Sequence, residues 1–556
     1  MPKTSNGGGQ NQSPLEQNRT RSQKYLARFS TFTKNHKFLC IFIALYCVFL
    51  VAFSRYAPNL DDLPYFSYIY QNEINFFTGG GGNPKNGRFY PFAFLDLLIL
   101  MKISTSPYLF FSVNALLFVI FCVIYIKILE LSNGKSTLNS VIIALLATSC
   151  GFVTVFFGIC YPEKVQIIWL SIFMLCSFCV IRDLRRDSYK DSGKSNRFTQ
   201  IFGILSLNIA LYYKEPTFAA AFAFGVVLLI YALQNRQKDL AKYALYILLS
   251  ALIYALLYVL LVVVFNNVRE HYYQESFVFA RELIRFALND SLIAFGIGGI
   301  ALYRIYLVAI KKARIEPFFD ALLCASLAYL SVFIALKMYN PYYLLPCFVF
   351  GIPSLLYFSR KYFHNLFIKI CIFLGLFGFF TQNLPSGIYK MIDLKAQGVQ
   401  FERSVDFVAD YLSANPNAKV YFAGIGRGKQ LYGYDAQIYS FYLIDFAIDT
   451  HDMDMNVWDI LRTNAPHSNK NDRFEVIYDA PKMGDLIIVS NKGAFGDSLR
   501  VAGENGELVF KSGFHTIPYV ALLPLAQYIS AKYFGTNLKN TNFFRMPTET
   551  FIFKVR

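Results

Sequence analysis

Long apolar segments alternate with short polar ones over the first two thirds of the chain. A helix needs about 17–25 predominantly apolar residues to cross the hydrocarbon core of a bilayer. The apolar segments predict eleven spans, at 38–54, 107–129, 138–159, 165–181, 199–212, 216–233, 243–265, 291–310, 318–336, 341–357 and 364–381. Segment 199–212 is short and is interrupted by Lys214 and Pro216, which predicts a tight helical hairpin with the next span.

From about position 395 the pattern becomes that of a globular protein. Apolar residues recur at helical spacing in "FERSVDFVADYLSANPNA", and Asn415 and Pro416 are expected to end that helix. The segments "KVYFAG", "GDLIIVS", "GELVFKSG" and "FIFKV" predict strands. Residues 395–556 are therefore expected to form a soluble α/β domain that follows a transmembrane module at 38–390.

Composition and charge support a polytopic α-helical membrane protein. The chain is 55% hydrophobic and 16% charged, with a net charge of +17. Much of the Lys and Arg lies in short segments between apolar runs, which indicates topology by the positive-inside rule and not nucleic-acid binding. Residues 1–37 predict a disordered, basic cytoplasmic tail. With eleven spans, the C-terminal domain then faces the periplasm or lumen.

The cysteines give no sign of a disulfide framework or a zinc site. All ten lie between Cys40 and Cys371, in or beside apolar segments, and the C-terminal third has none. Buried cysteines of this kind usually serve packing.

Polar motifs gather on the predicted extracytoplasmic face. The large first loop, 55–106, contains Asp61 and Asp62 and a glycine-rich turn, and it predicts two surface helices, at 61–77 and 89–103. The same face receives "CYPEKV", "LYYKEPTF" and "KMYNPYYLLP", and the loop before the eighth span adds His271, Arg281 and Arg285. Together these motifs predict a cavity at the membrane edge, lined by carboxylates, cations and tyrosines.

Such a cavity suits the transfer of a sugar from a polyprenyl phosphate. The leaving group is a phosphate, which needs cations, and the attacking hydroxyl needs one base, which a carboxylate can provide. Asp61 or Asp62 is the predicted base. The predicted groups for the donor phosphate and lipid are Lys214, Glu215, Arg88, Arg281 and Arg285. Substrate contacts are predicted for Glu163, Lys164, His271, Tyr339, Tyr342 and Tyr343.

Each motif also has a purely structural interpretation. An aspartate can cap a helix, and a Lys–Glu pair at a helix end can be an ion pair without function. Boundary tyrosines can form an aromatic belt, Arg88 can contact lipid head groups, and an amphipathic helix can explain "RELIRF". Two adjacent aspartates could also hold a divalent cation, and whether a metal is needed stays open.

The layout resembles the GT-C superfamily of polyprenyl-phosphate-sugar-dependent membrane glycosyltransferases. The resemblance rests on Asp61-Asp62 after the first span, the two predicted surface helices, "YYKEP", and the proline-ended "YNPYYLLP". It implies a GT-C-like fold and a lipid-linked sugar donor. A WWDYG-like motif of oligosaccharyltransferases is absent from the sequence, so the donor sugar and the acceptor stay open.

The functional hypothesis is a hexosyl- or pentosyltransferase of the bacterial inner membrane, with its active site on the periplasmic face. Its partners would be membrane lipids, the polyprenyl-phosphate sugar, and a glycan, lipid or protein acceptor. The alternatives are a lipid or oligosaccharide transporter or flippase, and an oligosaccharide ligase or polymerase. A transporter is disfavoured because acidic residues are almost missing from the span centres.

Overall fold

The structure is a computed structural model of the 556-residue chain. It describes residues 30, 33–55, 87–104, 106–134, 136–186, 193–265, 286–336, 340–423, 481–490, 502–513, 517–518, 520–534, 544–545 and 550–556. The predicted N-terminal tail and the predicted surface helix at 61–77 lie largely or wholly outside these residues.

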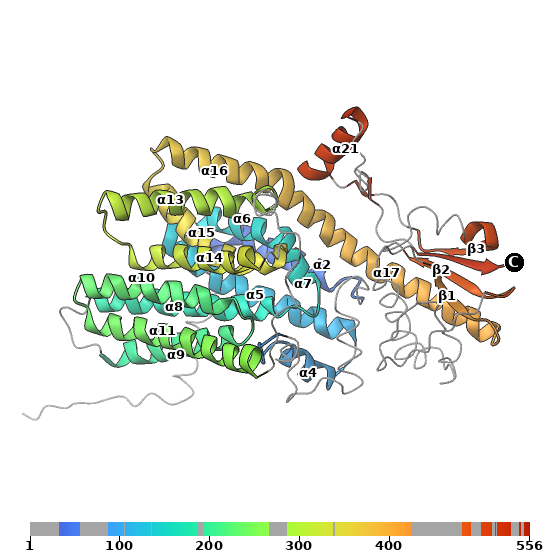
Figure 1. Ribbon diagram of the computed structural model, residues 1–556, viewed down its shortest axis with the longest axis horizontal. Helices are drawn as coiled ribbons and strands as arrows, with labels where there is room; N and C mark the ends of the chain where they lie inside the picture. The colour runs from blue at the N-terminus through green and yellow to red at the C-terminus, as the bar shows by residue number, and fades with distance from the viewer. Residues whose placement is uncertain are drawn as a thin grey trace, which may run out of the picture.

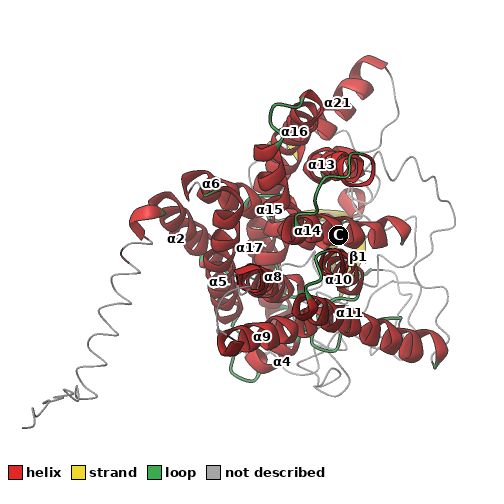
Figure 2. Cartoon of the chain, turned by 90° about the vertical axis from the view of Figure 1, so that its left-hand side faces the viewer, coloured by secondary structure: helices red, strands yellow, loops and turns green. Residues whose placement is uncertain are grey.

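The described helices form a bundle from which one long helix leads to a small sheet (Figure 1). Seen from the end of the bundle away from this sheet, most of the helices are viewed nearly end-on (Figure 2). The bundle consists of α2 (Lys37–Val51), α5 (Pro107–Asn133), α6 (Ser136–Ala147), α7 (Cys150–Phe157), α8 (Glu163–Arg186), α9 (Gly193–Leu211), α10 (Thr217–Gln234), α11 (Lys238–Tyr258) continued by η2 (Val259–Val264), η3 (Leu292–Ile297) continued by α13 (Gly298–Ile305) and η4 (Tyr306–Ile310), α14 (Pro317–Ala335), η5 (Pro341–Leu344) continued by α15 (Leu345–Lys361), and α16 (Leu366–Gly378).

The prediction of a polytopic helical fold is confirmed, and each of the eleven predicted segments falls on an apolar helix. In the described part of the chain, eight helices are long and apolar enough to cross a membrane, and a bent pair makes up to nine. Two further apolar helices, Lys37–Val51 and Arg197–Leu211, are shorter. Fifteen helical residues extend about 22 Å, less than the roughly 30 Å of a bilayer core, so α2 needs its flanking residues to cross.

The third predicted span, 138–159, is bent and not straight. Helices α6 and α7 meet at an angle of 68°. At the bend, the hydroxyls of Thr148 and Ser149 donate to carbonyls of the preceding turn, an arrangement that competes with the helical backbone bonds. The amide of Cys150 donates to Asn383 Oδ1 at 3.1 Å, so the first turn of α7 is capped from another helix. A Cβ on Gly387 would lie 2.0 Å from the Thr148 carbonyl, so only glycine allows this close approach.

Helix ends follow the expected residue chemistry. Proline stands at the first helical position of α5 and α14, where no backbone N–H is needed. Gly134, with φ of 70°, ends α5 in the left-handed conformation that glycine adopts without strain.

The last bundle helix leads without a break toward the C-terminal part. Helix α16 passes through the π-helical segment η6 (Phe379–Asn383) into α17 (Leu384–Ala414). Beyond it, β1 (Val420–Ala423), β2 (Leu486–Ser490), β3 (Gly506–Lys511) and β6 (Thr550–Val555) form one sheet in the order β1-β2-β6-β3. The β1–β2 pair is parallel and the other two are antiparallel. Phe407 of α17 stacks on Phe510 of β3, with ring centroids 4.8 Å apart.

Three smaller elements complete the described chain. They are α4 (Leu95–Met101), which lies within the predicted surface helix at 89–103, the two-stranded sheet of β4 (Ile517–Pro518) and β5 (Phe544–Arg545), and α21 (Leu522–Phe534).

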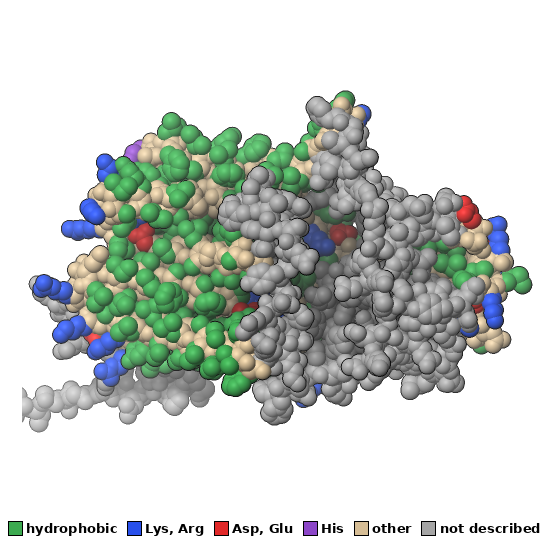
Figure 3. Space-filling view, viewed as in Figure 1, with side chains coloured by type: hydrophobic (Ala, Val, Ile, Leu, Met, Phe, Trp, Pro, Cys, Tyr) green, Lys and Arg blue, Asp and Glu red, His purple; other side chains and the backbone are tan. Residues whose placement is uncertain are grey.

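Basic residues gather at one end of the bundle. Apolar side chains cover the visible sides of the bundle, and Lys and Arg gather at the end away from the sheet (Figure 3). Exposed residues of α16, such as Phe373 and Phe377, show the same apolar character. By the positive-inside rule, the basic end would be cytoplasmic.

A buried ion pair holds that basic end together. The Arg304 guanidinium donates to both carboxylate oxygens of Asp320, at 2.9 and 2.6 Å, and to the Tyr362 hydroxyl at 2.9 Å. Asp320 also accepts from the Glu316 amide at 2.8 Å. This network joins α13, α14 and the end of α15, and both charges are well satisfied.

We expect Arg304→Met to destabilise the protein strongly. The variant leaves Asp320 buried without its cation, an effect of about 3–5 kcal/mol in comparable sites. Thermal unfolding in detergent should show a lower midpoint. The matched control is Lys242→Met, which breaks an exposed pair with Asp239 and should change the midpoint little. Equal midpoints for the two variants would contradict the structural role of the network.

Candidate functional site

Three connections between helices meet at the end of the bundle that faces the sheet. The turn 158–162 leads into α8, the turn 212–216 leads into α10, and residues 340–344 lead into α15. The carbonyls of Lys214 and Glu215 accept the first amide bonds of α10, at 3.2 Å each. Pro216 fits this helix start because its missing N–H is not required there. The sequence therefore places a charged pair at the boundary between two helices.

The turn before α8 is tightly fixed. Asn114, which is buried in α5, donates to the carbonyls of Phe156 and Gly158 at 3.0 and 2.9 Å. A Cβ on Gly158 would lie 2.3 Å from the Tyr161 ring, so a larger residue would displace that tyrosine. This turn sets the position of Glu163, the first residue of α8.

Glu163 and Lys214 form a buried ion pair. Their side chains approach to 2.8 Å and are 0% and 8% exposed. Burial by itself lowers the pKa of the Lys214 ammonium, but the nearby Glu163 and Glu215 carboxylates raise it by more, so its net pKa is raised. Lys214 is consequently a permanent cation at neutral pH.

Aromatic rings surround this cation. The Lys214 ammonium lies 4.7 Å from the ring centroid of Tyr343 and 5.6 Å from that of Tyr90. Tyr343 packs against Tyr342 at 4.3 Å, and Tyr342 packs edge-on against Tyr161 at 4.9 Å. Contacts of a cation with ring faces are favourable where water is excluded. These residues, with Glu163, Glu215 and Arg88, are termed the Lys214 cluster below.

Glu215 joins the end of the first external loop to the Lys214 cluster. Its Oε1 accepts from the Phe89 amide at 3.3 Å and lies 3.8 Å from Arg88 Nη1. The hydroxyl of Tyr254, on α11, donates to the Phe89 carbonyl. The Phe92 amide donates to the Tyr212 carbonyl at 3.1 Å. Residues 88–92 are thus fixed against α9, α10 and α11.

The other end of the same loop is fixed to α17. The Arg55 side chain is hydrogen-bonded to the Glu402 carboxylate and donates to the Tyr108 hydroxyl at 3.3 Å. Lys395, a buried residue of α17, donates to the Leu50 carbonyl at 2.5 Å, near the C-terminus of α2. Burial lowers the pKa of the Lys395 ammonium to about 7, so this contact does not depend on a permanent positive charge at the end of α2.

The structure brings seven of the predicted site residues into one region. Arg88, Glu163, Lys214, Glu215 and Tyr343 belong to the Lys214 cluster, and Tyr342 packs on Tyr343. Lys164 follows Glu163 and donates to the Ile159 carbonyl at 2.5 Å. The other predicted site residues, Asp61, Asp62, His271, Arg281, Arg285 and Tyr339, lie outside the described residues.

The charges of this region favour an anion. Arg88, Lys164 and Lys214 are cationic, and Glu163 and Glu215 are anionic, which leaves an excess of one positive charge among these side chains. Oε2 of Glu163 and of Glu215 is buried without a hydrogen-bond partner within the part of the chain that the structure describes. Such oxygens can accept hydrogen bonds from hydroxyl groups. The described residues contain no group of three or more His, Cys, Asp or Glu placed to hold a metal ion.

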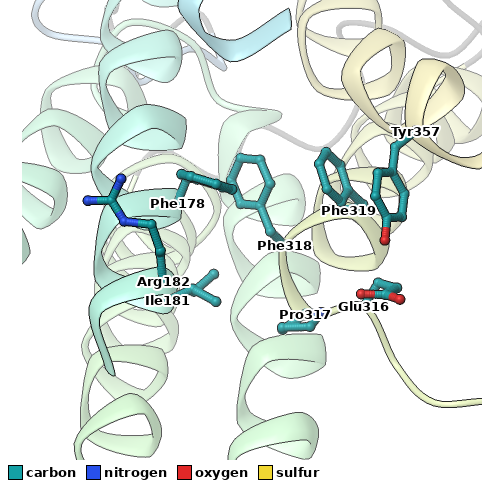
Figure 4. A pocket seen from close by; sticks show the side chains of 8 residues that line it. All are labelled: Phe178, Ile181, Arg182, Glu316, Pro317, Phe318, Phe319 and Tyr357. Carbon is teal, nitrogen blue, oxygen red and sulfur yellow. The ribbon is translucent and has the colours of Figure 1, made fainter. Parts of the chain in front are cut away.

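A separate cavity of about 310 Å³ lies at the basic end of the bundle. Side chains from α8, α14 and α15 line it, including Phe178, Phe318 and Tyr357 (Figure 4). Its charged residues already have partners, because Arg182 pairs with Asp183 and Glu316 with Lys361. This cavity is not part of the predicted site.

Sequence reasoning missed several residues of this region. Tyr90 and Tyr254 belong to aromatic-rich segments in which single tyrosines are not distinctive. Asn114 carries a clearer signal, because it is a polar residue with apolar neighbours along its helix, whereas Lys395 lies in a stretch with other polar residues such as Asp393 and Gln397. The sequence gives no indication of which backbone groups they would contact.

We expect Lys214→Met to lower stability, because Glu163 then stays buried without a cation. The effect should be roughly 3–5 kcal/mol. The double variant Glu163→Gln/Lys214→Met removes both charges and should recover part of the loss. The midpoints of thermal unfolding of the wild type, the single variant and the double variant measure this loss and its recovery. If the double variant is no more stable than Lys214→Met, the pairing of these two charges is not what stabilises the region.

Comparison with known proteins gives structural similarity only. No protein-family model matches the chain, and no curated protein matches it in sequence. Among solved structures, apo ArnT from Cupriavidus metallidurans is similar at a TM-score of 0.41 with 12% identity, covering 85% of this chain and 96% of that one. ArnT from the same organism bound to undecaprenyl phosphate has a TM-score of 0.41 and 11% identity, covering 82% and 94%.

The Archaeoglobus fulgidus oligosaccharyltransferase in the apo form has a TM-score of 0.40 and 13% identity, covering 72% of this chain and 63% of that one. At these scores no residue role and no activity is transferred to this chain, so the function is argued from its own residues.

Proposed function

We propose that this protein is a GT-C-type integral-membrane glycosyltransferase that moves a sugar from a polyprenyl-phosphate carrier to an extracytoplasmic acceptor. One observation carries the proposal. The loop that contains Asp61 and Asp62 is fixed at both ends, and one end lies on the Lys214 cluster, where buried ion pairs and tyrosines meet at the membrane edge.

The cations of this region are suited to the leaving phosphate. When the bond between the sugar and the carrier breaks, negative charge develops on the phosphate oxygens, and nearby cations stabilise that charge. Arg88 is the most exposed of the three, since 22% of its side chain is accessible and Lys214 and Lys164 are buried. Lys214 keeps its charge in the buried pair and contributes through the local field.

The base would come from the aspartate pair. A single displacement needs one carboxylate to take the proton of the acceptor hydroxyl, and the second can orient the acceptor. The sugar then passes to the acceptor oxygen, and the polyprenyl phosphate leaves with the electron pair of the broken bond. The unpartnered oxygens of Glu163 and Glu215 would accept hydrogen bonds from sugar hydroxyls.

The membrane setting fits a lipid-linked donor. Apolar helices surround the Lys214 cluster, so the polyprenyl chain can lie beside them while its phosphate stays at the edge. The basic end of the bundle would face the cytoplasm, and this supports an extracytoplasmic position for the Lys214 cluster, which in a bacterium would be the periplasmic side of the inner membrane.

We expect the variants Asp61→Asn and Asp62→Asn to show which aspartate is the base and which one orients the acceptor. The variant that lacks the base should lose about 10²–10⁴-fold in turnover, and the other variant should lose less. Transfer from a synthetic polyprenyl-phosphate sugar by purified protein measures this. Asp239→Asn, the same change at an exposed residue of the basic end, serves as the matched control. Full turnover in both aspartate variants would exclude this mechanism.

Arg88→Gln should weaken the donor phosphate contact and leave the fold intact. Loss of one charge-assisted contact corresponds to about a tenfold rise in KM for the lipid donor. Lys242→Met, a change at the basic end of the bundle, is the matched control for charge removal. An unchanged KM would place the phosphate elsewhere.

Transport of a lipid-linked sugar is the second candidate, and one observation favours it. The bend between α6 and α7 is that of a broken span or a re-entrant loop, and broken helices are often found at transporter binding sites. A flippase would move labelled polyprenyl-phosphate sugar across proteoliposomes without releasing polyprenyl phosphate, whereas a transferase releases it.

A further inference from the structure

Helix α21 (Leu522–Phe534) has no role in the proposed chemistry. Figure 1 shows that it lies apart from the β1-β2-β6-β3 sheet. It begins beside the bundle, where the Leu523 amide donates to Gln382 Oε1 at 2.9 Å. Gln382 belongs to η6, directly after the apolar helix α16. The start of α21 therefore lies at the level where the last span leaves the hydrocarbon region.

The helix points away from the bundle and across the direction of the spans. Figure 1 shows it rising from the junction of α16 and α17, at a steep angle to the long helices. Figure 2, viewed along those helices, shows the same helix extending beyond α16 at the rim of the molecule. Since the spans run roughly along the membrane normal, α21 is inclined toward the membrane plane.

One face of α21 is apolar and exposed. Leu525, Ile529 and Tyr533 follow one another at intervals of four residues, and they are 38%, 41% and 68% exposed. Val520, just before the helix, is 54% exposed. Lys532 lies beside Tyr533, with its ammonium 5.4 Å from the ring centroid. An apolar face with a tyrosine and a lysine at its border is typical of helices that lie in the membrane interface.

The apolar face continues an existing lipid-facing surface. Phe373, Phe377 and Phe380, on α16 and η6, are 66%, 50% and 47% exposed. Phe380 lies two residues before Gln382, the contact of α21 with the bundle. If a bilayer surrounds α16, the start of α21 lies at the outer surface of that bilayer.

We infer that α21 is an interfacial anchor that inserts its Leu525–Ile529–Tyr533 face into the extracytoplasmic leaflet of the membrane. This assignment is independent of the proposed transferase activity. Its consequence is that the C-terminal part is held at the membrane surface at a second place, apart from α17.

The test uses depth-dependent fluorescence quenching of the full-length protein in nanodiscs that hold one chain each. Ile529→Trp places a reporter on the anchor face, and Glu507→Trp, on exposed strand β3, is the matched control. The wild-type protein corrects for the two native tryptophans. Brominated phosphatidylcholine should quench the Ile529→Trp signal on the order of twofold more strongly than the control signal.

Equal quenching in the two variants would overturn the anchor. Quenching of the Ile529→Trp signal that appears only when several chains share a disc would also overturn it, because the exposed face would then be covered by a second copy. Circular dichroism of the variants checks that neither result comes from a loss of helix.

Discussion

The buried ion pair of Glu163 and Lys214 is the constraint on which the rest of the site depends. Taking two charges out of water at a membrane edge is costly unless their geometry is close and their remaining groups are satisfied. The chain provides the close geometry with two short turns between helices, one held by Asn114 and the other ending at Pro216. Glu163 Oε2 stays without a hydrogen-bond partner among the described residues, so the second condition is not met by the protein itself. Tyr90 and Tyr343 then exclude water from the lysine on two sides. This one ion pair thereby joins the start of α8 to the turn that links the end of α9 to the start of α10.

The first external loop is attached at places far apart in sequence. Arg55 bonds to a residue 347 positions later, and Phe89 bonds to one 126 positions later. Closing such contacts reduces the conformations that the intervening segment can adopt. A side chain in a loop that is fixed at both ends can be positioned more closely than one in a loop fixed at a single end. The Arg55–Glu402 contact also links the start of this loop to α17, and through α17 to the sheet.

Much of this architecture could be predicted from the sequence, because apolar length and strand pattern are local signals. All eleven apolar segments and the four strands of the main sheet were found in this way. The bend at Thr148–Cys150 could not be found, since it depends on Asn383 and Gly387 from a distant helix. For the site, the motif "YYKEP" indicated Lys214 and Glu215, but the partner of each charge follows from packing. The roles predicted for the aspartates stay predictions, as Asp61 and Asp62 lie outside the described residues.

The unbroken passage from α16 into α17 has a mechanical consequence. Thirty-one residues of α-helix extend about 46 Å, so α17 is a stiff rod that carries the sheet at its far end. Gly387 lies against the α6–α7 bend, Lys395 bonds to the end of α2, and Glu402 bonds to Arg55, so the first half of this rod is held against the bundle. A rearrangement of α2 or α7 would therefore be transmitted along α17 to the sheet, because the two are joined by one continuous helix.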